Sequence, residues 1–188
     1  MRHNREFEIA WQGLKPGPHT YMYDIDDRFM QERESDDSFK NWDACITLVF
    51  DKHERFFMLH FDVDGAVTVP CDRCGDEFRL RLWDEFDLVI KLVNEEADKI
   101  EDEDDVVFIP RSETVLDISR WLYEFLMLSV PLQHIHPDKE DGSAGCNPQA
   151  LNLLDKLSEH HEPAKNPLWS GLDKLKEVKS PKAKPKSK

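Results

Sequence analysis

Between residues 44 and 92 the chain alternates apolar and polar side chains in three successive runs, the pattern of strands with one buried face. The apolar positions are Ile46, Leu48 and Phe50, then Phe57, Leu59, Phe61, Val63, Val67 and Val69, then Phe78, Leu80, Leu82, Phe86, Leu88, Ile90 and Leu92. A polar turn at 51–54 predicts a hairpin, and together the runs predict a meander of long antiparallel strands. Gly65 interrupts the second run, where a missing side chain often marks a bulge or a tight bend.

Shorter elements are expected on both sides of this meander. Apolar residues alternate over 7–11 and again over 21–23, which predicts two short strands around a proline- and glycine-containing turn. Residues 26–38 predict a short helix that runs into a mobile loop. Residues 106–109 predict one further strand.

Helical spacing appears toward the C-terminal end. Asp117 is a candidate cap for a helix that Pro131 ends. Asn147-Pro148 and Asn166-Pro167 each place a capping side chain before a first-turn proline, which predicts a helix over 149–159 and another after residue 167. In the helix over 149–159, the residues expected to face inward are Leu151, Leu154 and Leu157.

These elements predict the α+β fold class, with an antiparallel multi-stranded sheet, open or closing into a partial barrel, followed by C-terminal helices. A single domain is expected over residues 1–175. Residues 176–188 are expected to be a disordered lysine-rich tail, because they cannot bury enough apolar surface to offset the entropy of ordering.

Charge is unevenly distributed along the chain. The 39 acidic residues outnumber the 25 lysines and arginines, giving a formal net charge of -14, which disfavours a body that lies on bare phosphates. The acidic run at 101–105 is expected to be a solvated loop. The tail carries the predicted RNA contacts, with a purely solubilising tail as the alternative. These contacts are Lys179, Lys182, Lys184, Lys186 and Lys188.

Several classes of protein are disfavoured by what the sequence lacks. No stretch approaches the roughly 18 apolar residues of a membrane span, and no apolar core of a signal peptide follows Met1–Glu6, so a cytoplasmic protein with no membrane partner is expected. The four cysteines form no disulfide framework. Phosphate-binding glycine motifs, a nucleophile elbow and a metalloprotease helix are missing, which favours a binding protein over an enzyme.

Cys71 and Cys74 have the spacing of a zinc knuckle, in which a tight turn points two thiolates at one tetrahedral metal. The completing ligands would come from His134, His136 and Cys146, and the predicted set is Cys71, Cys74, His136 and Cys146 around a structural zinc. An ordinary strand turn with two reduced cysteines is the alternative. A redox role is disfavoured because the turn joins two strands and not a strand to a helix.

The other candidate residues have simpler interpretations. Phe57 and Phe61 could stack nucleic-acid bases, but their alternation and the acidic body favour a core position. Cys45 is expected to be a small buried side chain. His53 and His60, with no apparent partner in the sequence, are expected to be surface or packing residues.

The order of these motifs is that of a known family. A hairpin leads into Val69-Pro70-Cys71-Asp72-Arg73-Cys74, and Phe78 and an acidic loop follow. The likeness continues through Leu116-Asp117-Ile118 and the stretch from Glu124 to Pro131, and it closes with Asn166-Pro167-Leu168-Trp169-Ser170-Gly171-Leu172. Over roughly residues 7 to 175 the chain resembles the YceD-like family, described as a large ribosomal RNA accumulation factor in bacteria and plastids.

The resemblance implies a non-enzymatic factor that supports large-subunit ribosomal RNA accumulation and ribosome biogenesis by binding a ribosomal protein or pre-ribosomal RNA. Because the body is acidic, a basic ribosomal protein suits it better than bare RNA. The chain departs from the family pattern in two places: His134, His136 and Cys146 stand where a second Cys-x-x-Cys is common, and Leu168 replaces an arginine. The alternatives are a zinc-dependent RNA-processing hydrolase and an interaction module unconnected with ribosomes.

Overall fold

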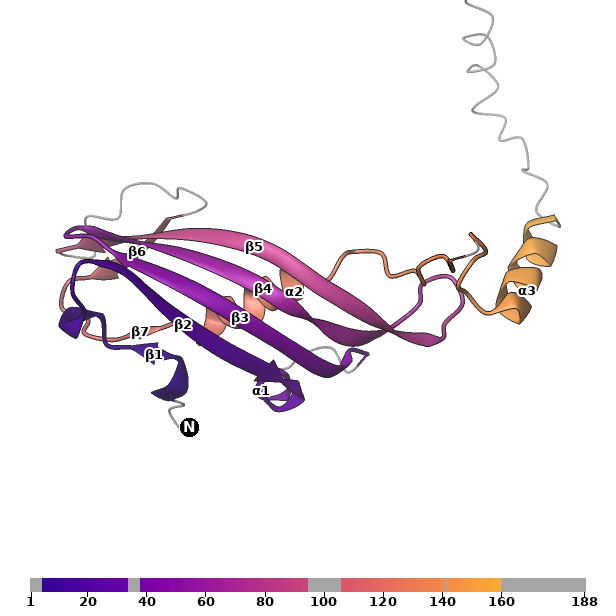
Figure 1. The fold of residues 1–188 in the computed structure, drawn as a ribbon, viewed down its shortest axis with the longest axis horizontal. Helices are drawn as coiled ribbons and strands as arrows, with labels where there is room; N and C mark the ends of the chain where they lie inside the picture. The colour runs from indigo at the N-terminus through magenta and orange to yellow at the C-terminus, as the bar shows by residue number, and fades with distance from the viewer. Residues whose placement is uncertain (1–4, 34–37, 95–105, 141, 160–188) are drawn as a thin grey trace, which may run out of the picture. The chain divides into compact units, whose positions relative to one another are not determined.

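The computed structural model of the chain describes residues 5–33, 38–94, 106–140 and 142–159 (Figure 1). The chain divides into two compact units, Met1–Asn147 and Pro148–Lys188. The acidic run at 101–105, the helix expected after residue 167, the predicted domain end at 175 and the lysine-rich tail lie outside the described residues.

The largest element of the first unit is a five-stranded sheet with strand order β2-β3-β4-β5-β6. Its strands are β2 (Gly17–Asp26), β3 (Lys40–Lys52), β4 (Phe56–Pro70), β5 (Glu77–Val93) and β6 (Val106–Pro110). Strands β3 to β5 form the predicted antiparallel meander, and β2 extends it by one further antiparallel strand. Among the described strands β2 and β6 do not pair with each other, so the sheet is open and the α+β class is confirmed.

Strand β6 is the exception to the antiparallel order. It pairs in parallel with the last five residues of β5, Val89–Val93. Residues 94–105 connect the two strands, and a parallel pair needs a connection of about a dozen residues to return to the same end of the sheet. The predicted strand is therefore present, but the sheet is mixed.

The N-terminal residues form a second, smaller sheet. Strand β1 (Glu8–Ile9) pairs antiparallel with β7 (Leu116–Asp117), and the 3-10 turns η1 (Arg5–Phe7) and η2 (Trp11–Gly13) flank it. The prediction of two strands paired around a turn is therefore wrong in its pairing, because the strand at 21–23 belongs to the long strand β2. The short helix expected after residue 26 is α1 (Asp27–Gln31).

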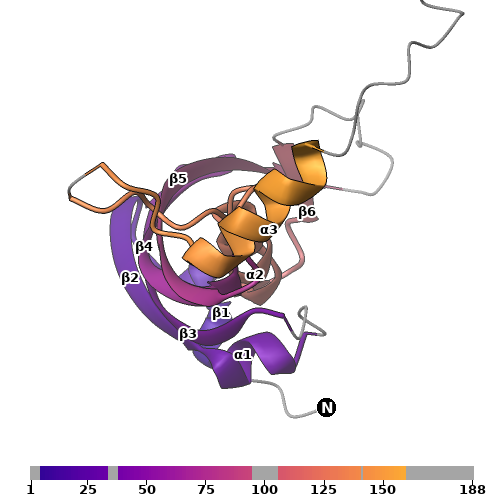
Figure 2. The ribbon, with the colours of Figure 1, turned by 90° about the vertical axis from the view of Figure 1, so that its right-hand side faces the viewer.

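Helix α2 (Ser119–Leu128) lies in the hollow of the curved sheet (Figure 2). Asp117 accepts a hydrogen bond from the Ser119 N–H at 2.9 Å, at the predicted start of the helix. The Phe125 ring packs edge-on against Phe61 at 4.9 Å and stacks on Phe86 at 4.6 Å. Phe61 is fully buried, as is Phe57, so both belong to the core and cannot stack bases.

Gly65 allows two strands to approach closely. A Cβ at this position would lie 2.5 Å from the Cα of Ala44 on β3, so no larger residue fits without separating the strands. Pairing continues through Gly65 on both sides of β4, and the expected bulge is therefore absent there. The described irregularity between β3 and β4 lies between Lys40 and Asp43.

The second unit contains helix α3 (Pro148–Glu159), which matches the helix predicted over 149–159. The expectation that its leucines face inward is wrong for Leu154 and Leu157, which are 44% and 59% exposed, whereas Leu151 is half-buried. None of the helices in the described residues has the length and apolarity needed to cross a bilayer.

Candidate metal centre

Cys71 and Cys74 lie in the turn that connects β4 to β5. The Cys71 N–H donates to the carbonyl of Asp76 at 3.0 Å, and the Gly75 N–H donates back to the carbonyl of Cys71 at 2.8 Å. Gly75 has a φ of 79°, a left-handed conformation that glycine adopts without steric cost. This tight turn brings both thiols to one side of the hairpin tip.

The chain that follows α2 returns to this tip and is held there by the turn's aspartates. Asp72 makes a reciprocal contact with His134: its N–H donates to the His134 carbonyl at 2.7 Å, and its carboxylate accepts from the His134 N–H at 2.6 Å. The Asn147 amide donates to the carboxylate of Asp76 at 3.0 Å. These contacts hold His134 and Asn147 against the turn, close in sequence to the other two candidate ligands, His136 and Cys146.

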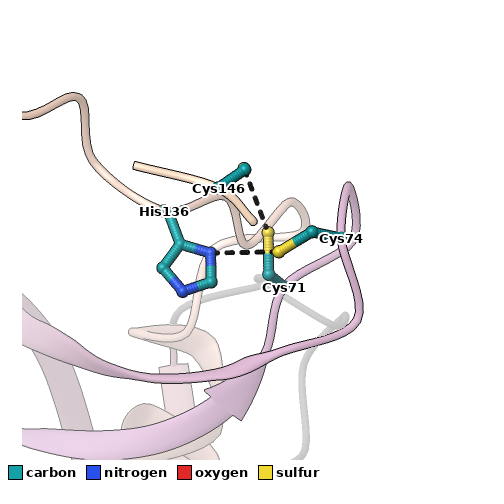
Figure 3. Close-up of side chains that lie close together, drawn as sticks. All are labelled: Cys71, Cys74, His136 and Cys146. Carbon is teal, nitrogen blue, oxygen red and sulfur yellow. Dashed lines mark hydrogen bonds between the residues drawn. The ribbon is translucent and has the colours of Figure 1, made fainter. Parts of the chain in front are cut away.

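Four candidate donor atoms meet at the tip, from Cys71, Cys74, His136 and Cys146 (Figure 3). All of them lie within 4.8 Å of one another, with 3.8 Å between Cys71 Sγ and Cys146 Sγ and 3.4 Å between Cys74 Sγ and His136 Nδ1. A tetrahedral zinc with Zn–S bonds of about 2.3 Å separates two sulfurs by about 3.8 Å. The donor set and its spacing therefore fit zinc, and soft thiolates disfavour calcium and magnesium.

The surroundings of Cys71 favour its thiolate form. Burial alone would raise the pKa of this thiol, but backbone N–H groups of His136, Cys74 and Arg73, together with the His136 ring, lower that pKa to about 6. Cys146 behaves in the opposite way, because burial and then the neighbouring Cys71 and Cys74 sulfurs raise its pKa. Thiolates this close together repel one another. A divalent cation bound between them would offset that repulsion, and its binding would displace the remaining thiol protons.

His134, the third residue considered as a completing ligand, is not part of the cluster. Its ring packs edge-on against Phe39 at 5.5 Å, and its Nδ1 lies 3.8 Å from the Asp72 carboxylate. The His136 ring instead packs against Phe78 at 4.5 Å and faces the thiols. His134 therefore positions the segment through its backbone, while His136 supplies the donor atom.

The structure corrects the interpretation of three other candidates. Cys45 is half-buried on the outer face of the sheet and not in the core, and burial followed by Asp24 raises its pKa. His53 and His60 do have carboxylate partners: His53 Nε2 lies 3.1 Å from Asp51, and His60 Nδ1 lies 2.7 Å from Asp87. Both histidines are half-buried, so only the expected lack of a partner is wrong, and the prediction of surface or packing residues stands.

Sequence reasoning missed the residues that support the cluster, namely Asp72, Asp76, Gly145 and Asn147. A Cβ on Gly145 would meet the carbonyl oxygen of Pro137 and lie 3.2 Å from the Cβ of His136, so only glycine lets the two ligand-bearing stretches approach. The sequence did offer one indication of this role, because Gly145 stands directly before the candidate ligand Cys146.

A protein-family model described as "Large ribosomal RNA subunit accumulation protein YceD" matches residues 59–176. The matched region contains most of β4, all of β5 and α2, and the four candidate ligands. No curated protein and no solved structure matches the chain.

Proposed function

Because the chain belongs to the YceD family of large ribosomal RNA subunit accumulation proteins, we propose that it acts in large-subunit ribosomal RNA accumulation by binding and not by catalysis. The family match over residues 59–176 is the observation that carries the role in RNA accumulation. The mode of action, a non-enzymatic factor that engages a ribosomal protein or pre-ribosomal RNA, is the proposal.

The candidate metal centre supports a structural role for zinc in this proposal. Catalytic zinc sites keep one position open for water or substrate, whereas structural sites are closed by four protein ligands. Cys71, Cys74, His136 and Cys146 supply four donors, so a bound zinc would have a closed shell. It would join the β4–β5 turn to the segment that follows α2 and would stabilise both.

The net charge of -14 favours a basic protein as the direct partner of the body. An acidic surface repels the phosphate backbone but attracts the lysine- and arginine-rich segments by which proteins bind RNA. A factor of this kind would shield such a segment until the RNA site for it has formed.

Deleting the gene tests the proposal directly. Large-subunit ribosomal RNA should fall relative to small-subunit RNA, and a plasmid copy of the wild type should restore it. Unchanged ribosomal RNA and normal subunit profiles would overturn the role. Purified protein should also leave precursor ribosomal RNA intact, and cleavage that a chelator abolishes would establish the hydrolase in place of the binding factor.

The lysine-rich tail leads to a separate prediction about RNA. A chain ending at Val178 lacks five lysines, Lys179, Lys182, Lys184, Lys186 and Lys188. Each lysine that neutralises a phosphate contributes about -0.7 to the slope of log K against log salt for single strands, so truncation should reduce that slope by about 3.5.

Filter binding or fluorescence anisotropy at several salt concentrations measures this slope. Replacing the five lysines with glutamine should reproduce the truncation, whereas replacing them with arginine should preserve the slope. Equal affinity and equal slope in all variants would exclude the tail as an RNA contact.

A further inference from the structure

The outer face of the sheet, opposite the core, carries two neighbouring cross-strand rows of side chains. The antiparallel pairing of β2, β3, β4 and β5 defines them. One row is Asp24, Cys45, Asp64 and Trp83, and the other is Met22, Thr47, Asp62 and Glu85. Directly opposed residues on one face lie about 5 Å apart. The eight side chains therefore form one continuous surface, called here the outer patch.

Two large apolar side chains stand exposed at the two ends of the outer patch. Trp83 is 77% exposed on β5 and Met22 is 70% exposed on β2, although their chain neighbours Leu82 and Tyr23 are buried. Helix α2 covers the opposite face of the sheet, so it shields neither residue (Figure 2). Exposed tryptophan and methionine are enriched where proteins bind partners.

The outer patch carries four carboxylates and no lysine or arginine of its own. Asp24, Asp62 and Glu85 form no ion pair within the described part of the chain. Asp64 is paired with Arg81 at 3.2 Å, and Asp43 beside the patch is paired with Arg79 at 3.4 Å, so these two carboxylates are already compensated. The face therefore retains negative charge next to an exposed indole.

A hollow of about 460 Å³ lies within this acidic surface. Its lining includes the small residues Cys45, Gly65 and Ala66, and the carboxylates Asp24, Asp43 and Asp64. Because Gly65 has no side chain, the backbones of β3 and β4 approach closely beneath it. Of these three carboxylates only Asp24 has no ion pair among the described residues, so Asp24 is the one that is available to a cationic side chain.

We propose that the outer patch is the docking surface for a lysine- and arginine-rich segment of a partner protein. The carboxylates would pair with its cationic groups, one of which would enter the hollow. Trp83 would hold a guanidinium or an alkyl-ammonium stem over its ring through cation–π and apolar contact. This docking surface gives the proposed function a binding site. It rests on the proposed function only for the statement that the partner is a ribosomal protein.

A synthetic dodecapeptide of alternating arginine and alanine, carrying a fluorophore, is the probe for this surface. Its affinity for the full chain, measured by anisotropy at 50 and 150 mM salt, should fall at least tenfold in Trp83→Ala and in the double variant Asp62→Asn/Glu85→Gln. The double variant Glu54→Gln/Glu113→Gln removes the same charge from exposed positions outside the patch and should bind like the wild type.

Equal peptide affinity in all these variants would overturn the proposal. The chain ending at Val178 is tested as well, because the lysines it lacks could compete with the peptide for the patch. If the peptide binds neither the full chain nor this shorter chain, the proposal is also overturned. A single-stranded RNA dodecamer serves as the opposite test. If it binds the full chain and the same patch variants weaken that binding, the proposal is overturned, because the outer patch would then bind RNA and not a basic protein segment. The deletion strain separates this result from the proposed function. If ribosomal RNA falls on deletion but patch variants bind the peptide normally, only the docking surface is wrong; if the patch binds but ribosomal RNA is unchanged, only the ribosomal role is wrong.

Discussion

Cys71→Ser should yield a protein without stoichiometric zinc that is at least about 3 kcal/mol less stable than the wild type. Cys71 is buried at the hairpin tip, and its sulfur lies 3.8 Å from that of Cys146, the spacing of two zinc ligands. A ligand that binds only the folded chain contributes about 4 kcal/mol when its free concentration is a thousand times Kd. Elemental analysis of protein purified without chelator measures the metal, and urea unfolding measures the stability.

Cys45→Ser is the matched control, because it removes a half-buried thiol that lies outside the cluster. It should retain one equivalent of zinc and lose much less stability than Cys71→Ser. A chelator should reduce the stability of the wild type and of Cys45→Ser, and it should leave Cys71→Ser unchanged. Sub-stoichiometric zinc in the wild type would contradict the site and favour an ordinary turn with reduced cysteines.

The loss of zinc should also be visible locally. The N–H groups of Asp72 and His134 link the turn to the segment after α2 through hydrogen bonds of 2.7 and 2.6 Å. With the metal gone, only such contacts hold the two stretches together, so these amides should exchange faster with solvent. Amides in the middle of β4, such as that of Phe61, should keep their protection.

The long strands were predictable because their two-residue period is a local signal. Alternation placed β3, β4 and β5 correctly and assigned Phe57 and Phe61 to the core. The pairing of β1 with β7 and the parallel orientation of β6 were not predictable in this way, because they depend on which distant segments meet. Local periodicity carries no information about that choice.

The candidate metal site was also predictable only where the signal is local in the sequence. Cys-x-x-Cys spacing identified two donors, and the predicted set added His136 and Cys146, the residues that meet them in the structure, although no spacing rule separates His136 from His134. The choice between them depends on Asp72, which binds the backbone of His134 from a turn far away in the chain. The sequence analysis did not single out Trp83, although its place directly after the inward-facing Leu82 puts it on the outer face of the strand.

Phe61→Ala should destabilise the protein by about 3 to 5 kcal/mol, the range for deleting a buried aromatic side chain. Phe61 is fully buried, and its ring contacts Phe125 of α2 at 4.9 Å. Its removal would leave a cavity between the sheet and the helix that packs in its hollow, and neither element can close it without breaking other contacts. The midpoint of urea unfolding, compared at equal m-value, measures the loss.

Met58→Ala is the matched control on the same strand, since Met58 points to the outer face and is 51% exposed. It should change the stability by less than about 0.5 kcal/mol, as is usual for surface substitutions. A loss below about 1 kcal/mol in Phe61→Ala, accompanied by weaker binding of single-stranded RNA, would mean that the ring stacks bases and not core residues. A large loss of stability with unchanged RNA affinity is expected, because a ring enclosed between β4 and α2 can contact RNA only after the helix has left the sheet.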